Sequence, residues 1–332
     1  MSAPPTPYEF TGPLRLTNSE MASFKLCRRD WYLRYYLGLV PRIGPVAGSP
    51  LSIGTAVHDA LAAYYEQFVE GRMSADVKMP VEFVGAVYAA AIANEPHREV
   101  ELATEQDLVT IMIDGYGSWL EEEGHDADLR ILAPETRVEV PLVVTGDGEV
   151  LATLMSKLDA RVERISTTER LALEHKTCTN LKQNLPVLQG DSQLLTEHLV
   201  EKMSLVAAGE SGRRADGVLY NMLRKVKRTG TAKPPFYGRE HVWHNDAELR
   251  NHHAHAWSIA TSILEARRRL DAGESHHTVC PPSVGRELSW KSGFLAYYVL
   301  VDDGSDWAAA LDDHYVQGDP LARYDGTTSI DD

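Results

Sequence analysis

The chain has 332 residues, of which 43% are hydrophobic, and it carries a formal net charge of −15. This composition is typical of one or two globular domains and excludes a disordered or collagenous chain, while the acidity argues against non-specific nucleic-acid binding. No apolar run reaches the roughly 18 residues of a membrane helix and no signal peptide is evident, so we expect a cytoplasmic protein without a membrane partner.

The first part of the chain is predicted to be helical. Residues 1–16 are rich in proline and are expected to form a flexible arm. Thr17 and Glu20 have the spacing of a capping box, which predicts a helix from there to about Leu39. Apolar periodicity predicts three more helices, so residues 17–132 form a helical region. These helices are expected at 53–69, 81–94 and 105–122.

The second part of the chain alternates strands with helices. β-branched alternation on both sides of Gly146–Gly148 predicts a hairpin, and a third strand follows it. The expected strands are 137–144, 149–165, 171–177, 217–223 and 240–244, and the expected helices are 188–207 and 246–270. This order predicts an α/β fold with a mixed central sheet in residues 133–272, to which the helical region is a large N-terminal addition. Residues 273–332 are expected to be an irregular segment with an acidic tail.

Three side chains on neighbouring predicted strands have the chemistry of a catalytic site. Side chains alternate along a strand, so Glu174 and Lys176 project from one face and His175 from the other. A hairpin across 161–171 brings Asp159 near Glu174. Two carboxylates with a backbone carbonyl suit a hard cation such as Mg²⁺, which lowers the pKa of a bound water. The alternative is an exposed strand with ordinary salt bridges.

A histidine in the helix at 53–69, His58, precedes these three residues, and the ordered set resembles the PD-(D/E)XK nuclease superfamily. Within it, the set is similar to the RecB-like branch, which includes CRISPR-adaptation and phage exonucleases. The resemblance runs from Leu16 to about Tyr324 and implies a restriction-endonuclease-like mixed sheet. It also implies that Lys176 orients the attacking water, and that Mg²⁺ or Mn²⁺ is bound by four groups. These groups are the side chains of His58, Asp159 and Glu174 and the backbone carbonyl of His175.

Two further features of the resemblance imply contacts with DNA. The family has a helix with the motif Q-x-x-x-Y that supports the site and contacts DNA; Gln193 fits its glutamine, although Glu197 stands at the tyrosine position. Gln189 is an alternative, but it is followed by Gln193 at that spacing. Basic residues in the first helix and after strand 217–223 are candidates for phosphate contacts, with solvated surface charges as the alternative. These candidates are Arg28, Arg29, Arg224 and Lys225.

Two other metal sites are considered from the cysteines and histidines. Many RecB-like nucleases bind an iron–sulfur cluster through four cysteines, of which only the first is matched here, by Cys27. The other three positions hold poor cluster ligands, namely Leu288, Ser292 and Tyr298. We therefore expect no iron–sulfur cluster. The histidines of helix 246–270 lack partners at zinc-site spacing and are expected to form a solvated face. They are His252, His253 and His255.

The resemblance implies a metal-dependent exonuclease that hydrolyses phosphodiester bonds in phage or bacterial DNA recombination or replication. DNA is then the substrate, and a recombination or replication protein is a candidate partner. The alternative is a catalytically silent scaffold of the same fold that binds DNA or a protein, and a zinc enzyme built on the histidines is a third hypothesis. The intact set of acids and lysine favours the nuclease, because a silent site has no chemical reason to keep them. A basic cleft on an acidic body reconciles the net charge with DNA binding.

Overall fold

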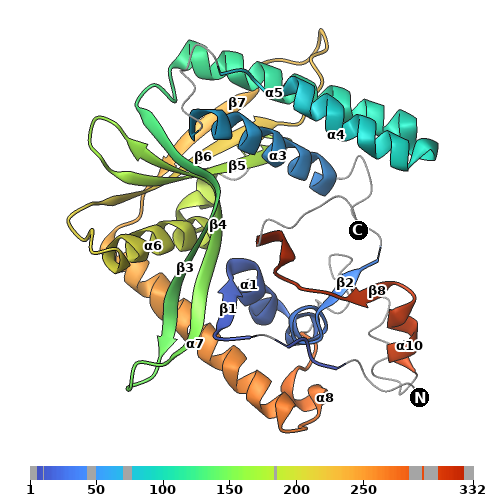
Figure 1. The fold of residues 1–332 in the computed structure, drawn as a ribbon, viewed down its shortest axis with the longest axis vertical. Coiled ribbons are helices and arrows are strands. Elements are labelled where there is room, and N and C mark those ends of the chain that lie inside the picture. The colour runs from blue at the N-terminus through green and yellow to red at the C-terminus, as the bar shows by residue number, and fades with distance from the viewer. Residues whose placement is uncertain are drawn as a thin grey trace. The chain divides into compact units, whose positions relative to one another are not determined.

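The computed structural model describes residues 6–9, 11–42, 50–69, 77–182, 185–283, 294 and 306–324. The chain divides into two compact units, which are drawn together in Figure 1. Unit 1 comprises Met1–Gly44, Glu139–Ser156 and Arg250–Asp332, and unit 2 comprises Pro45–Val138 and Lys157–Leu249. The chain passes from one unit to the other within strands β3 (Leu129–Val144) and β4 (Val150–Arg164) and within helix α7 (Asp246–Asp271).

Unit 2 contains the mixed sheet that the sequence predicted. Its further strands are β5 (Arg170–Cys178), β6 (Ala215–Arg224) and β7 (Tyr237–Val242). β5 pairs antiparallel with the end of β4 and parallel with β6, and β7 pairs antiparallel with β6. Ala160 on β4 lies opposite Leu173 on β5, so the next step of this register brings Asp159 beside Glu174. The predicted hairpin between these two strands is therefore confirmed.

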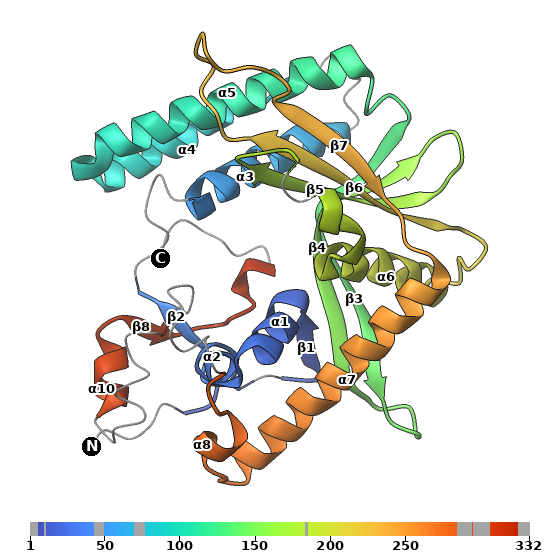
Figure 2. The same cartoon turned by 180° about the vertical axis from the view of Figure 1, so that it is seen from behind.

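Helices cover both faces of this sheet (Figures 1 and 2). Helices α3 (Pro50–Val69), α4 (Val81–Asn94) and α5 (Glu99–Glu123) lie on one side, and α6 (Ser192–Ala207) lies on the other. Short 3₁₀ turns at Pro96–Arg98 and Leu185–Gly190 precede α5 and α6. Leu171 and Leu173 of β5 are fully buried in a cluster with residues of α3 and α5. Because strand side chains alternate, Glu174 points to the opposite face, toward α6.

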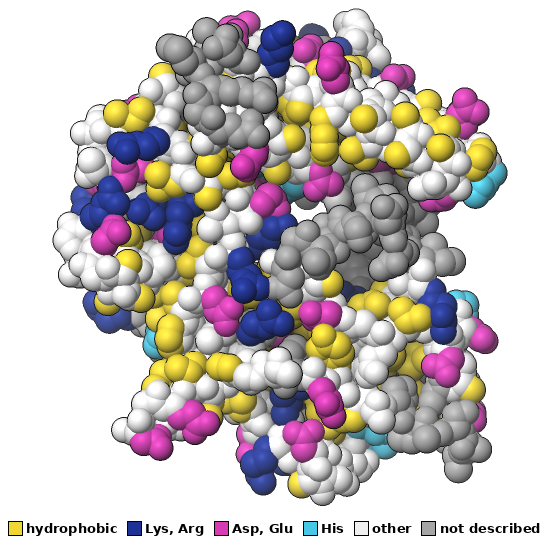
Figure 3. Space-filling view, viewed as in Figure 1, with side chains coloured by type: hydrophobic (Ala, Val, Ile, Leu, Met, Phe, Trp, Pro, Cys, Tyr) yellow, Lys and Arg dark blue, Asp and Glu magenta, His cyan; other side chains and the backbone are white. Residues whose placement is uncertain are grey.

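Helix α4 has an exposed apolar surface. Its Val84 and Tyr88 are buried, whereas Phe83 is 41% exposed. Figure 3 shows hydrophobic side chains in a row along the outer surface of the α4–α5 pair. Even so, none of the helices in the described ranges combines the length and the hydropathy needed to cross a membrane.

Unit 1 joins segments from both ends of the chain. Strand β1 (Leu14–Thr17) pairs parallel with the start of β4, and β2 (Leu39–Pro41) pairs antiparallel with β8 (Tyr315–Gln317). The other elements are helices α1 (Asn18–Leu26), α2 (Arg28–Trp31), α8 (His276–Val279) and α10 (Trp307–Asp312), a π-helix at Tyr32–Tyr36 and a 3₁₀ turn at Ala322–Tyr324. Sequence patterning did not indicate β1, because four residues are too few to establish an alternation.

The first predicted helix is wrong in its length. Thr17 caps α1 as expected, since its Oγ1 accepts a hydrogen bond from the Glu20 N–H at 3.2 Å. The chain then leaves the helical conformation at Cys27 (φ −160°, ψ 111°) and resumes in α2. The break lets Trp31 pack on Phe24, with ring centroids 5.0 Å apart, and the indole N–H donates to Glu20 Oε1 at 3.0 Å. Packing of this buried ring outweighs the continuous helix that the apolar spacing predicted.

The other boundaries differ from the predictions by a few residues. Helix α4 begins and ends where it was expected, whereas α5 begins at Glu99 instead of residue 105. Strand β3 begins at Leu129, ahead of the predicted residue 137, because its first half is half-buried and lacks clear alternation. Strand ends are poorly marked by composition, since pairing with a neighbour extends a strand beyond its apolar residues.

Candidate active site

Asp159 of β4 is held from two sides. Its Oδ1 lies 3.0 Å from Nδ1 of His58 on α3, and its Oδ2 accepts a hydrogen bond from the backbone N–H of His175 at 2.7 Å. Burial alone would lower the pKa of His58, but the Asp159 carboxylate raises it to about 9. Burial has the opposite effect on an acid and would raise the pKa of Asp159, yet the positive charge of His58 holds that pKa well below its ordinary value. The two side chains therefore form a half-buried ion pair at neutral pH.

Glu174 and Lys176 lie together on the α6 face of β5, as the alternation predicted. Lys176 Nζ forms an ion pair with Glu174 Oε1. Gln193 of α6 bridges this pair: its Oε1 accepts from Lys176 Nζ at 3.1 Å, and its Nε2 donates to Glu174 Oε1 at 2.8 Å. The same Nε2 lies 2.8 Å from Oε1 of Glu197. One amide thus orients the lysine and contacts two carboxylates.

Helix α6 is fixed at its start by its cap. The side chain of Asp191 accepts hydrogen bonds from the N–H groups of Gln193 and Leu194, at 2.8 and 3.4 Å. Asp191 is one of the residue types that favour the N-cap, because its oxygen satisfies amides that lack a helical partner. The cap therefore places Gln193 in the first turn, facing β5.

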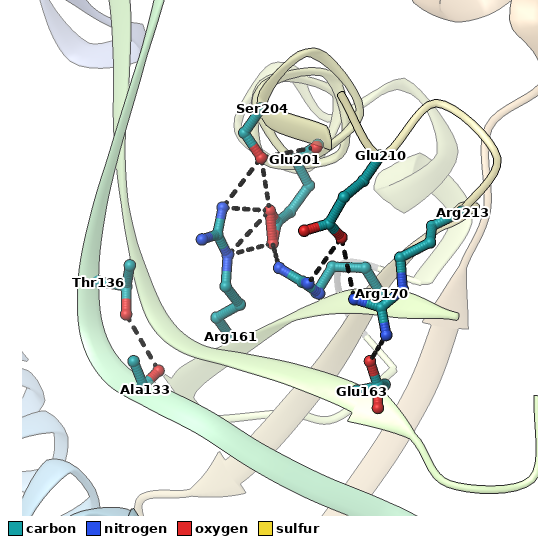
Figure 4. Close-up of polar contacts among 9 residues, drawn as sticks. All are labelled: Ala133, Thr136, Arg161, Glu163, Arg170, Glu201, Ser204, Glu210 and Arg213. Atoms are coloured by element: carbon teal, nitrogen blue, oxygen red, sulfur yellow. Dashed lines mark hydrogen bonds and ion pairs between the residues drawn. The ribbon is translucent and has the colours of Figure 1, made fainter. Parts of the chain in front are cut away.

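A network of alternating charges fixes α6 farther along, as Figure 4 shows. Arg161 of β4 makes a bidentate pair with the buried Glu201: Nε lies 2.5 Å from Oε1, and Nη2 lies 2.6 Å from Oε2. Arg170 of β5 lies 3.9 Å from Glu201 and from Glu210, and Arg213 joins Glu210 to Glu163 of β4. Helix α6 is thus tied to both strands of the candidate site.

The carboxyl groups of Glu174 and Glu197 are both fully buried in this cluster. Burial and then the nearby charge of Asp159 raise the pKa of Glu174 to about 7, against the opposing attraction of Lys176. Burial and the charge of Glu174 raise the pKa of Glu197 well above its ordinary value. Crowded carboxyl groups with raised pKa values are a frequent property of sites that bind a cation or transfer a proton.

The side chain of His175 faces away from the cluster and supports the strand from behind. It stacks on Tyr65 with ring centroids 5.6 Å apart, and its Nδ1 lies 3.3 Å from Nδ2 of Asn221 on β6. Asn221 Oδ1 accepts from Arg239 Nε at 2.5 Å, and Arg239 pairs with Asp126 at 2.8 Å. Burial lowers the pKa of His175 to about 3, so the ring is neutral. This packing holds the backbone that the resemblance implies as a cation ligand.

The predicted basic residues lie in different settings. Arg224 and Lys225 follow β6, and the Lys225 N–H donates to the Cys178 carbonyl at 2.8 Å, so they lie beside the end of β5. Arg28 is exposed and belongs to unit 1. Arg29 is only 1% exposed, and its Nε donates to the Cys280 carbonyl at 2.9 Å. Because a buried guanidinium cannot reach a phosphate, we correct the expectation for Arg29 and assign it a structural role.

The structure adds two acidic residues that the sequence did not assign to the cluster. Glu197 was noted only as a departure from a motif, although its spacing of four from Gln193 places both on one helix face. Glu135 of β3 has a left-handed backbone (φ 45°), and its carboxylate pairs with Lys157. Burial raises the pKa of Glu135, and the charge of Asp159 adds to this effect. The unusual conformation of Glu135 has no signature in the sequence.

The chemistry of the cluster fits a divalent cation. Within the described ranges, no three His, Cys, Asp or Glu side chains stand ready-arranged to hold a metal ion. The carboxylates of Asp159 and Glu174 are instead paired with His58 and Lys176. The donor set of buried carboxylates, an imidazole and a backbone carbonyl suits Mg²⁺ or Mn²⁺. Glu197 Oε2, buried and without a hydrogen-bond partner in the described residues, is an orphaned acceptor at the same place.

The expectations that the protein has no iron–sulfur cluster and no zinc site on the histidines of α7 remain predictions. Leu288, Ser292 and Tyr298 lie outside the described residues, and Cys27 is buried at the break after α1. On α7, His255 is exposed, and His252 and His253 are half-buried. His276 of α8 stacks on Tyr32 with centroids 4.9 Å apart.

Comparison with protein families identifies the superfamily of the chain. A family model that describes the PD-(D/E)XK nuclease superfamily matches residues 15–281. No curated protein matches the chain. The matched range includes the helix that carries His58, the two strands that carry Asp159, Glu174 and Lys176, and helix α6. Because the match covers most of the chain, the chain belongs to the PD-(D/E)XK nuclease superfamily.

Proposed function

We propose that the protein is a Mg²⁺- or Mn²⁺-dependent deoxyribonuclease of the RecB-like branch, and that it acts as an exonuclease in bacterial or phage DNA recombination or replication in the cytoplasm. One observation carries the proposal, namely the convergence of His58, Asp159 and Lys176, which are half-buried, around the buried Glu174. An ordinary exposed salt-bridged strand does not explain this cluster, because Glu174 is only 1% exposed and burial of its charge costs more than an exposed ion pair contributes.

In this proposal each residue of the cluster has a chemical task. The side chains of His58, Asp159 and Glu174 and the carbonyl of His175 hold the cation. When bound, the cation supplies positive charge to the phosphate and lowers the pKa of the attacking water. Lys176 Nζ donates a hydrogen bond that orients this water, and Gln193 keeps the ammonium group in place at 3.1 Å. Orientation by fixed groups is worth several kcal/mol of a reaction barrier, about 7–11 kcal/mol at most.

A basic loop beside the cluster supports a nucleic-acid substrate. Residues 224–233, which link β6 to β7, contain five basic side chains, Arg224, Lys225, Lys227, Arg228 and Lys233. The loop begins next to Cys178, two residues after Lys176. The Arg224 guanidinium donates to the carbonyls of Thr179 and Lys233, at 3.3 and 3.0 Å, and so stabilises the loop. Positive charge near the cluster gives an acidic protein a local surface for phosphates.

The test is a cleavage assay on end-labelled linear DNA, with circular DNA of the same sequence beside it. We expect degradation of linear DNA with Mg²⁺ or Mn²⁺, none with EDTA, and none of the circle. Asp159→Asn and Lys176→Met should stay folded by circular dichroism and lose at least about a hundredfold in rate. Lys202→Met, on the outer part of α6, is the matched control and should keep full activity. Full activity of either site variant contradicts the proposal, and DNA binding without cleavage by the unaltered protein supports the silent scaffold instead.

A further inference from the structure

Glu197 is a buried acid whose second oxygen has no partner. It lies one turn after Gln193 on α6 and is fully buried. Its Oε1 lies 2.8 Å from Gln193 Nε2. Its Oε2 has no hydrogen-bond partner in the part of the chain that the structure describes. A buried polar atom of this kind costs free energy, so its retention calls for a ligand or a function.

The surroundings of Glu197 indicate which ligand would satisfy this oxygen. Glu174 and Asp159 contribute negative charge to its environment, and Lys176 contributes positive charge. Gln193 Nε2 is already shared between Glu197 and Glu174, so it has no further proton for Oε2. A cation fits a lone oxygen among carboxylates, because it satisfies the oxygen and also balances the surrounding negative charge, which a bound water would not do.

We propose that Glu197 is a third carboxylate ligand of the divalent cation, acting with Asp159 and Glu174. This inference rests on the proposed function. A histidine that binds a metal is neutral, so three carboxylates and the ammonium of Lys176 leave two negative charges, which one divalent cation balances. Without Glu197 only one negative charge would face the cation. The third carboxylate therefore matches the charge of the cluster to that of its ligand.

The test measures Mn²⁺ binding to the metal-free protein by calorimetry and by electron paramagnetic resonance, without DNA or turnover. Glu197→Gln keeps the size of the side chain and an oxygen that accepts from Gln193, so it removes only the charge. We expect a loss of more than about a hundredfold in Mn²⁺ affinity, because residues that only support metal ligands contribute about ten- to a hundredfold. Glu240→Gln on β7, which removes an exposed carboxylate, should bind Mn²⁺ as the unaltered protein does.

Two other outcomes overturn the inference and can be told apart. Unchanged Mn²⁺ affinity in Glu197→Gln, with a clear loss in Asp159→Asn, shows that Glu197 only positions Gln193, and leaves the proposed function intact. Failure of the unaltered protein to bind Mn²⁺ removes both the inference and the proposed function. A melting curve of Glu197→Gln that matches the unaltered protein confirms that the change in affinity is not a loss of fold.

Discussion

Gln193 Oε1 lies 3.1 Å from Lys176 Nζ, and the amide of the same side chain contacts Glu174 on the other side. Gln193 of α6 therefore fixes the direction of the lysine ammonium group together with the ion pair to Glu174. We expect Gln193→Ala to lower kcat by about ten- to a hundredfold, because the ammonium group loses one of the two partners that orient it, while KM for DNA changes little. Steady-state kinetics on linear DNA measure both constants.

The control for this variant is Gln189→Ala. Gln189 is the other candidate for the glutamine of the Q-x-x-x-Y motif. Its Nε2 donates a hydrogen bond to the Trp243 carbonyl at 2.7 Å, away from the cluster. It should keep the kcat of the unaltered protein. A larger effect at Gln189 than at Gln193 would contradict the assignment.

The pair between Arg161 and Glu201 predicts a large loss of stability when it is broken. Arg161→Ala leaves the buried Glu201 carboxylate with the Ser204 hydroxyl at 3.2 Å and with a more distant cation, Arg170 at 3.9 Å. Removal of one member of a buried pair costs about 3–5 kcal/mol, because the remaining charge is uncompensated. Urea unfolding followed by circular dichroism measures this loss. Ser204→Ala, which removes one hydrogen bond to Arg161, should cost about 1 kcal/mol, and equal effects of the two changes would refute the explanation.

Glu20 predicts a pH dependence of stability. Its burial raises the pKa of the carboxyl from its ordinary value near 4.5 to about 7, against the opposing charge of Arg267 and the hydrogen bond from Trp31. Between these values the folded protein holds a proton that the unfolded chain has lost. The contribution of Glu20 to the free energy of unfolding is therefore fully present below pH 4.5. It is lost as the pH rises toward 7, and the total loss is about 3 kcal/mol.

Glu20→Gln isolates this contribution, because the amide stays neutral and can still accept from Trp31. The difference in free energy of unfolding between Glu20→Gln and the unaltered protein should grow in favour of the variant from pH 4.5 to pH 8. Urea unfolding at several pH values measures it. A difference that stays constant across this range would show that Glu20 is not protonated in the folded state.

The basic loop between β6 and β7 predicts a salt-dependent affinity for DNA. Lys225→Ala and Lys227→Ala should each weaken binding equally for all sequences and lower the slope of log affinity against log salt by about 1. Fluorescence anisotropy with EDTA, which prevents cleavage, gives this slope. Lys202→Ala is the control, because Lys202 pairs with Asp246 at 2.5 Å on another part of unit 2. An unchanged slope in both loop variants would exclude the loop from the DNA surface.

Local features of the fold could be predicted from the sequence, and long-range ones could not. The opposite directions of Glu174 and His175 follow from the period of a strand, and the Thr17 cap follows from residue type. The break at Cys27 could not be foreseen, because it depends on where Trp31 packs. The place of His58 was implied only by the resemblance, since nothing near it in the sequence points to Asp159.

The supporting contacts of the site were also beyond the sequence. Asn221, Arg239 and Asp126 come from three separate segments and meet only behind His175. Each looks like an ordinary polar residue when it is read alone. Glu197 could be placed on the face of Gln193 by its spacing, but its burial depends on how α6 lies against β5.

The tight packing of His175 against Tyr65 and Tyr116 has a consequence for how this protein can change in evolution. The odd-numbered Leu171, Leu173 and His175 of β5 fill the interior, and the even-numbered Glu174 and Lys176 carry the charges of the site. An insertion or deletion of one residue between Leu173 and Lys176 would exchange the two sets, driving a lysine among the tyrosines and an imidazole out toward α6. The packing of the interior and the chemistry of the site therefore both fix which side chains of β5 face each side of the sheet. We expect insertions and deletions in related sequences to occur in the turns and not in this strand.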